Sequence, residues 1–320
     1  MKSAGTTRIA IVGAGHVGAT FAYALMLSGL ASEIVLIDVR TTLAEGEAMD
    51  LSHAVPFGHP TRIWAGDYSD CAGAVVTVIA AGVNQKPGET RLELLNNNVA
   101  VFREIVPQVV QHNPNGILLV ATNPVDLLTY VSLKLSSLPT ASVIGSGTTL
   151  DTARFRYLLG QHCGVDARSV HAHVIGEHGD SEVPLWSLAN IAGMQLADYC
   201  AAHDISYGQS DRDELFRGTR DAAYEIIKRK GATYYAVAAG LVRIVESIVR
   251  DQHTVLSVST RVDDYHDISD VCLSLPCVIS REGVTRVLRL ELSSEEVTAL
   301  QRSAGVLRAA LANVSVAHTH

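Results

Sequence analysis

Three glycines near the amino end constrain the fold more than any other feature of this sequence. Gly13, Gly15 and Gly18 follow the apolar run 8–12 and open the apolar stretch 16–29, which has helical periodicity. In such a strand–turn–helix unit the first glycine permits a tight turn, the second lets a ligand approach the backbone, and the third allows close helix–strand packing. The motif therefore predicts a nucleotide site with phosphates at the helix N-terminus.

The rest of the first half alternates apolar strands with helical patterns. We expect strands at 8–12, 33–38, 62–66, 74–81, 117–121 and 142–145, and helices at 16–29, 41–54, 91–111 and 124–136. Strands that are continuously apolar indicate a parallel sheet covered on both faces. The sequence thus predicts an α/β fold whose N-terminal Rossmann domain, a doubly wound parallel sheet, spans residues 1–147.

The pattern changes after residue 147. A helix is expected at 149–163, a long helical tract at 211–250, strands at 254–262 and 271–280, and a closing helix at 293–313. This order predicts that residues 148–320 form a C-terminal α+β catalytic and substrate domain. No Ser- or Gly-rich linker separates the halves, so we expect one rigid unit.

Composition narrows the possible partners and compartments. The formal net charge of −8 argues against nucleic acid or an anionic membrane as the main partner. Residues 9–32 carry no formal charge, but the clustered glycines favour a strand, a turn and a buried helix over a membrane span. Five widely spaced cysteines predict inert thiols in a reducing, cytoplasmic compartment. We expect no metal site.

Asp38 strengthens the nucleotide prediction. It ends the second predicted strand, 20 residues after Gly18. A carboxylate there binds the adenosine ribose hydroxyls and repels a 2′-phosphate, so NAD is favoured over NADP. The neighbouring Arg40 keeps NADP open, and a glycine turn that binds no nucleotide is the alternative structural reading.

Four further segments carry polar side chains suited to catalysis. A Gly- and Pro-bearing loop at 81–91 predicts a lid, 121–126 follows an apolar strand, 151–156 lies in a helix pattern, and 176–181 is the run GEHGDS. With QKPGETR, ATNPVD and LDTARFR in the same order and spacing, the chain resembles the lactate/malate dehydrogenase family, and more narrowly its bacterial L-lactate dehydrogenases, over nearly its whole length.

The chemistry of a 2-keto acid reduction suits these residues. Hydride transfer to a ketone needs a proton donor, and we expect His178 to be that donor. The resemblance assigns the carboxylate that orients it to Asp151. Arg154 follows Asp151 by three residues, so both face one side of a helix, and its guanidinium suits a substrate carboxylate. Arg91, on the lid, would polarise the ketone oxygen.

The resemblance implies further contacts at the carboxyl ends of the strands. Those to substrate fall on Gln85, Arg91, Asn123, Asp126, Asp151, Arg154 and Thr233. Those to the cofactor NAD fall on Gly13, Gly15, Val17, Gly18, Asp38, Tyr68, Gly82, Val83, Ala121, Thr122, Asn123 and Ser146. Two residues at the rim of the site differ from those found in relatives. Leu43 stands where relatives often have a Lys near the adenosine, and Glu104 stands where some relatives have a Ser.

The neutral Gln85 favours pyruvate and lactate over oxaloacetate and malate. A second substrate carboxylate buried beside it without a charge partner would be costly, whereas an arginine there would bind it. Thr233 is small enough for the pyruvate methyl group, and larger 2-keto acids stay open. A non-catalytic NAD-binding protein is the alternative of another class, and the presence of His178 and Arg154 argues against it.

A second cationic pair predicts regulation. Arg156 follows Arg154 by two residues, about 200° around a helix, so it should point away from the catalytic pocket. In the family, residues matching Arg156 and His171 line a fructose 1,6-bisphosphate site at a subunit interface. The resemblance therefore implies an activated homo-oligomer, a tetramer with a dimer as the alternative.

Overall fold

The computed structural model describes residues 6–83 and 91–314, without the side chain of Arg91. One large sheet runs through this part of the chain in the order β14-β13-β12-β6-β5-β4-β1-β2-β3. Its strands are β1 (Arg8–Val12), β2 (Glu33–Ile37), β3 (Arg62–Ala65), β4 (Val76–Ile79), β5 (Ile117–Val120), β6 (Val143–Gly145), β12 (Thr254–Val262), β13 (Val271–Ser280) and β14 (Gly283–Val287).

The first six strands are parallel, as their apolar sequences predict. Strand order reverses between β1 and β4, which is where an open α/β sheet binds its ligand. The helices of this half are α1 (His16–Ser28), α2 (Thr41–Ala54), α3 (Arg91–His112) and α4 (Val125–Ser136). The predicted N-terminal Rossmann fold with a C-terminal α+β part is confirmed.

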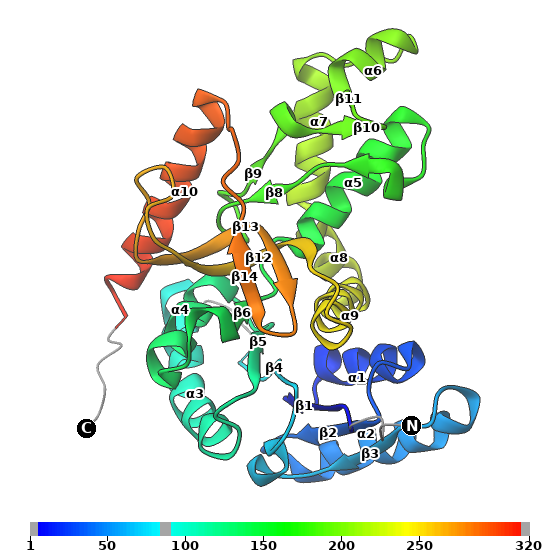
Figure 1. Cartoon of the computed structure of the whole chain (residues 1–320), viewed down its shortest axis with the longest axis vertical. Coiled ribbons are helices and arrows are strands. Elements are labelled where there is room, and N and C mark those ends of the chain that lie inside the picture. The colour runs from blue at the N-terminus through cyan, green and yellow to red at the C-terminus, as the bar shows by residue number, and fades with distance from the viewer. Residues whose placement is uncertain (1–5, 84–90, 315–320) are drawn as a thin grey trace.

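The sheet does not stop where the predicted first domain ends. Strands β12, β13 and β14 are antiparallel and extend it beyond β6, with Ser259 of β12 opposite Gly145 of β6. A Cβ on Gly145 would lie 2.8 Å from the Ser259 Cβ, so the glycine permits this close approach. Figure 1 shows β12–β14 lying across the middle of the molecule, above β4–β6. Strand β14 was not expected from the sequence.

The C-terminal half adds a second, smaller core. Its helices are α5 (Thr149–Cys163), α6 (Leu196–Ala202), α7 (Gln209–Arg220), α8 (Ala222–Lys230), α9 (Tyr235–Val249) and α10 (Ser294–Leu311). Its short strands are β7 (Val170–His171), β8 (Val174–Ile175), β9 (Val183–Pro184), β10 (Asn190–Ile191) and β11 (Met194–Gln195). Phe155 and Leu159 of α5 are fully buried in this core.

The expected continuous tract at 211–250 is divided into α7, α8 and α9. The break after α8 falls at Gly231, whose φ of 88° is a conformation that L-residues rarely adopt and that ends the helix. Helix α9 then packs against α1, while α3 packs against α4 (Figure 1). The break at Gly231 leaves Thr233 in a loop instead of a helix.

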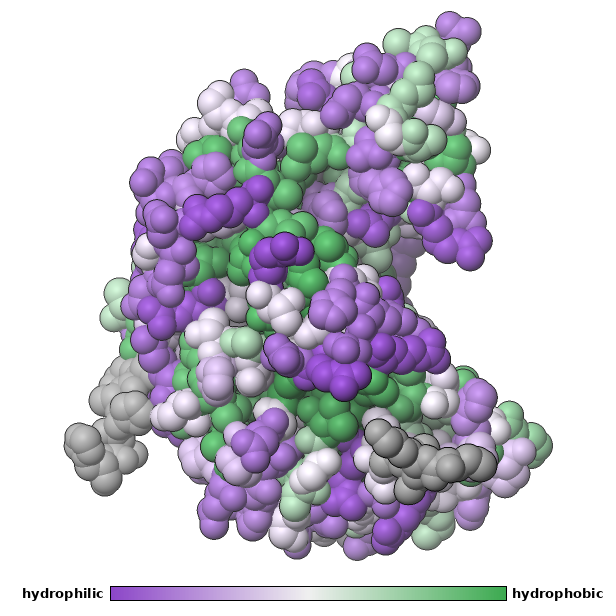
Figure 2. Space-filling model, in the orientation of Figure 1, coloured by the Kyte–Doolittle hydropathy of each residue, from purple (hydrophilic) through white to green (hydrophobic). Residues whose placement is uncertain are grey.

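The described residues include no helix that is both long and apolar enough to cross a membrane. The apolar stretch 9–32 instead forms β1, the glycine turn and the partly buried helix α1, as its glycines predict. Figure 2 shows hydrophilic side chains over much of one face, with apolar side chains gathered in the middle where β12–β14 lie. The five cysteines are buried and free.

Candidate active site

The glycine turn between β1 and α1 leaves room for a ligand at one position only. A Cβ on Gly13 would lie 2.4 Å from the Ala81 nitrogen, and one on Gly18 would lie 1.8 Å from the Gly13 carbonyl oxygen. Around Gly15, in contrast, the described residues beyond its chain neighbours and its own helix place no atom within 4 Å of the Cβ position. The outer glycines therefore serve packing, and the open space at Gly15, the N-cap of α1, fits a pyrophosphate of NAD.

Asp38 is held at the same turn. Its Oδ2 accepts a hydrogen bond of 2.7 Å from the Ala14 amide, and its Oδ1 accepts one of 2.9 Å from the Arg40 amide. The Arg40 guanidinium is 3.5 Å from Oδ1, so its charge is partly offset by the carboxylate. Tyr68, half-buried, lies near both Asp38 and Glu104, whose charges, after burial, raise its pKa. This arrangement supports NAD over NADP.

A buried amide, Asn98 of α3, anchors the segment that follows β4. Its Oδ1 accepts a 2.8 Å hydrogen bond from the Val83 amide, and its Nδ2 donates to the Asn123 carbonyl at 3.3 Å. The Thr122 hydroxyl donates to the Ala81 carbonyl at 2.7 Å. Gly82 is required here, because a Cβ would lie 2.4 Å from Thr122 Cγ2. Sequence reasoning missed Asn98, although a polar run inside an apolar helix pattern marks it.

A pocket joins the carboxyl ends of the strands to the C-terminal half. Its lining comes from the glycine helix, the ends of β5 and β6, the first turn of α5, His178, the 231–234 loop and α9: Val17, Ala121, Asn123, Ser146, Gly147, Thr149, Leu150, His178, Thr233, Val237, Gly240 and Leu241. Predicted cofactor contacts and predicted substrate contacts therefore line one pocket.

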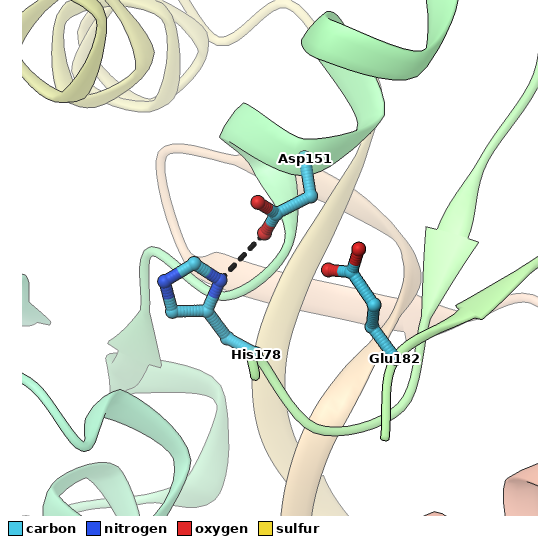
Figure 3. Close-up of side chains that lie close together, drawn as sticks. All are labelled: Asp151, His178 and Glu182. Atoms are coloured by element: carbon cyan, nitrogen blue, oxygen red, sulfur yellow. Dashed lines mark hydrogen bonds and ion pairs between the residues drawn. The ribbon is translucent and has the colours of Figure 1, made fainter. Parts of the chain in front are cut away.

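His178, Asp151 and Arg154 form a hydrogen-bonded set beside this pocket. The His178 Nδ1 lies 2.5 Å from the Asp151 Oδ2 (Figure 3). The Arg154 Nη1 lies 2.8 Å from the Asp151 Oδ1. Asp151 is in the first turn of α5, where the helix dipole favours a carboxylate, and its side chain is 3% exposed. Both of its oxygens are thus bonded to cationic or ionisable partners, and the His178 Nε2 stays available for a reacting oxygen.

Electrostatics keep this histidine protonated. Burial alone would lower the pKa of His178, but the charge and hydrogen bond of Asp151, together with the charges of Asp126 and Glu182, outweigh burial and raise that pKa to about 9. Burial likewise acts to raise the pKa of Asp151, while His178 and Arg154 together lower it. The pair is therefore an imidazolium–carboxylate ion pair at neutral pH, which is a stored proton donor.

Asp126 supports His178 instead of lining the pocket. Its carboxylate is 2% exposed and accepts a 2.7 Å hydrogen bond from the His178 amide. Burial raises the pKa of Asp126 to about 6. In this position it fixes the backbone that carries the imidazole, and its expected contact with substrate stays a prediction.

Glu182 is a further carboxylate that the sequence reasoning missed. One imidazole nitrogen of His178 and one carboxylate oxygen each of Asp151 and Glu182 lie within 4.8 Å of one another. Figure 3 shows the two carboxyl groups beside the imidazole. Glu182 is 6% exposed. A carboxylate directly after GEHGDS and directly before apolar residues was the signal that could have marked it.

Arg156 and His171 lie near each other, away from the pocket lining. The Arg156 Nε donates a 2.8 Å hydrogen bond to the Ala172 carbonyl, and His171 is exposed on β7. Burial, followed by the charges of Arg156 and His171, lowers the pKa of His173 to about 4. Arg156 and His171 thus lie at the same edge of the small core, outside the pocket.

Two residues that are predicted to contact substrate lie wholly or partly outside the described residues. Gln85 is not among the described residues, and for Arg91 only the backbone at the start of α3 is described. Their assignments, and that of the lid, stay predictions.

Comparison with known proteins matches both halves of the chain. Residues 7–145 match the lactate/malate dehydrogenase NAD-binding domain, and residues 148–317 match the lactate/malate dehydrogenase alpha/beta C-terminal domain. The L-lactate dehydrogenase of Acetivibrio thermocellus is 52% identical over 301 residues, covering 94% of this chain and 95% of that protein. A probable L-lactate dehydrogenase of Schizosaccharomyces pombe is 51% identical over 309 residues, covering 97% and 93%.

Solved structures agree with these relatives. A crystal structure of the minor L-lactate dehydrogenase from Enterococcus mundtii superposes with a TM-score of 0.94 at 40% identity, covering 98% of this chain and 99% of that one. A lactate dehydrogenase from a Medee basin deep-sea metagenome library gives a TM-score of 0.93 at 44% identity, with 96% and 98% coverage.

Proposed function

This chain belongs to the lactate/malate dehydrogenase family and is an NAD-dependent oxidoreductase, and we propose that it reduces pyruvate to (S)-lactate. The observation that carries the proposal is the imidazole of His178, which contacts the buried Asp151 carboxylate beside Arg154 in a pocket shared with the glycine helix. This set supplies a proton and an anion-binding cation side by side, which a 2-keto acid requires.

Bound NADH supplies the hydride for the ketone carbon. The His178 Nε2–H then donates its proton to the ketone oxygen, so that the carbonyl becomes a hydroxyl and the imidazole becomes neutral. Asp151 holds the imidazole through Nδ1 in both states. Arg154 uses one of its donors on Asp151 and keeps the others for the substrate carboxylate. Arg91 is proposed to stabilise the developing charge on the ketone oxygen.

The choice of pyruvate is part of this proposal. It rests on the neutral Gln85 in the sequence and on Thr233, which lines the same pocket as His178. Oxaloacetate would bring a second carboxylate, which a glutamine does not neutralise. Larger 2-keto acids are the remaining alternative.

We propose in addition that residues 1–147 hold NAD and residues 148–320 supply the catalytic side chains, in a cytoplasmic homotetramer that works in lactate fermentation. The position of Arg156 beside the segment that carries the exposed His171 supports activation by fructose 1,6-bisphosphate across a subunit interface. An effector that bridges subunits would favour the assembled, substrate-competent state.

Steady-state kinetics with NADH test the proposal. Pyruvate, oxaloacetate and a longer 2-keto acid are compared, each with and without fructose 1,6-bisphosphate. Pyruvate is expected to give the highest kcat/KM. A higher value for oxaloacetate would overturn the assignment of the substrate, and the absence of NADH oxidation with all three acids would overturn the reaction class.

A further inference from the structure

Glu182 is a buried carboxyl group that the proposed chemistry does not use. It lies between Ser181 and strand β9 and is 6% exposed. One of its carboxylate oxygens lies within 4.8 Å of polar side-chain atoms of Asp151 and His178. Its Oε1 is fully buried and has no hydrogen-bond partner in the described part of the chain. An ionised carboxylate in such a place would carry an uncompensated charge, which is costly.

The charges that face Glu182 come from three neighbouring segments. Asp151 and Arg154 lie on α5, His178 lies in the loop between β8 and β9, and Arg220 is the last residue of α7. The two cations nearest the pocket are already bonded to Asp151, one to each of its oxygens. Burial and then Asp151 raise the pKa of Glu182 to about 8, against the opposing effects of His178, Arg154 and Arg220.

The protonation state of Glu182 decides the charge of the site. With Glu182 neutral, the ionised Asp151 and Asp126 contribute two negative charges, and the protonated His178, Arg154 and Arg220 contribute three positive charges. The excess positive charge matches the single carboxylate of a 2-keto acid. With Glu182 ionised the excess disappears, and a bound substrate anion adds a negative charge that no group in this set offsets.

We propose that Glu182 must be protonated for the pocket to accept its anionic substrate, so that this side chain sets the alkaline limit of substrate binding. It acts through the charge of the site, without a contact to the reacting atoms, and is therefore a positioning residue in this reaction. The inference rests on the proposed reduction of a 2-keto acid.

The test compares the KM for pyruvate between pH 7 and pH 9 in the wild type and in Glu182→Gln, a permanently neutral isostere. Between pH 7 and pH 9, ionisation of Glu182 (pKa about 8) should raise KM about tenfold and that of His178 (pKa about 9) about twofold, so the wild-type KM should rise about twentyfold. In Glu182→Gln that rise should shrink to about twofold, the part that remains from the titration of His178. Glu182→Asp keeps an ionisable group and should restore a pH-dependent KM.

A matched control is Glu225→Gln on α8, where the glutamate is exposed and pairs with Arg229. Its KM profile should follow the wild type. A wild-type KM that stays level from pH 7 to pH 9, or a Glu182→Gln profile that rises as steeply as the wild type, would overturn the proposal.

A second measurement does not depend on turnover. Infrared difference spectra across pH 8 should show loss of a buried protonated carboxyl signal in the wild type and no such loss in Glu182→Gln. If this signal behaves as expected but no 2-keto acid is reduced, the proposed function fails while the protonation of Glu182 stands. If the signal is absent from the wild type at pH 7, the inference about Glu182 fails, whatever the substrate.

Discussion

Replacing Asp151 by asparagine separates the two effects of this carboxylate on His178. Asparagine keeps a hydrogen-bonding group beside the Nδ1 but removes the largest of the negative charges that raise the pKa of His178. The pKa of His178 should then fall from about 9 to its ordinary value of 6.5 or below, since burial is the largest remaining influence. A fall of about 2.5 pKa units corresponds to about 3 kcal/mol of lost stabilisation of the protonated imidazole.

The consequence for the rate follows from the fraction of protonated histidine. At pH 7.5 this fraction should fall from about 97% in the wild type to about 9% or less in Asp151→Asn. The rate of a single turnover of bound NADH with saturating pyruvate should therefore fall at least about tenfold from this cause alone. At pH 5.5 the deficit should narrow by about tenfold, because acid restores the proton that the charge no longer retains.

The assay is stopped-flow oxidation of NADH at pH 5.5 and pH 7.5, with Asp166→Asn as a control. Asp166 is an exposed aspartate that pairs with Arg168 outside the pocket, so its replacement should leave the profile unchanged. A deficit in Asp151→Asn that is equal at the two pH values would refute the reasoning, because Asp151 would then act by orienting the imidazole and not by charge.

Three further outcomes are expected. His178→Asn should lower kcat by about 10³-fold or more with NADH binding nearly intact, and wild-type turnover should fall as pH rises through about 9, as measured by pH–rate profiles and NADH titration. A wild-type rate that stays level to pH 10 while the chemical step limits turnover would contradict the assignment of His178 as the proton donor. Gln85→Arg should shift kcat/KM toward oxaloacetate by roughly several kcal/mol, and an unchanged substrate ratio would exclude Gln85 as the discriminating residue. Fructose 1,6-bisphosphate should lower the KM for pyruvate, less so at high salt and high pH, and His171→Gln should weaken the effect; no change at millimolar effector, low salt and pH 6 would argue against the site.

Local signals were sufficient for most of the elements. Strands β1, β12 and β13 and helices α2 and α5 have the bounds expected from their periodicity. Helix α10 begins at a capping box, in which the Ser293 hydroxyl accepts from the Glu296 amide, and such caps are legible in a sequence. The division of the 211–250 tract was missed because an isolated glycine within a helical pattern can be tolerated, so Gly231 does not by itself mark the end of a helix.

The site shows where sequence reasoning ends. The spacing of Asp151 and Arg154 places both on one face of a helix, and the structure has them in contact. The position of Asp126 behind His178 depends on the packing of α4 against β13, a tertiary contact that no local pattern encodes. Glu182 was missed for the same reason, since only the fold brings it to α5 and removes it from water.

The bridge between Ser259 and Gly145 gives the molecule a mechanical property. Strands β12–β14 continue the sheet that ends in β6, and a bridge between Gly176 and Ser274 joins the segment before His178 to β13. The glycine turn and His178 are therefore connected through one continuous sheet, without a hinge between two separate sheets. Gly147 adds to this connection, since a Cβ there would lie 2.5 Å from the Ser259 nitrogen. Reacting atoms must approach to about 3–3.5 Å, and a misplacement of about 1 Å can slow a reaction about 100-fold. The alignment of proton donor and cofactor is therefore set when the chain folds, and substrate binding has only to complete it.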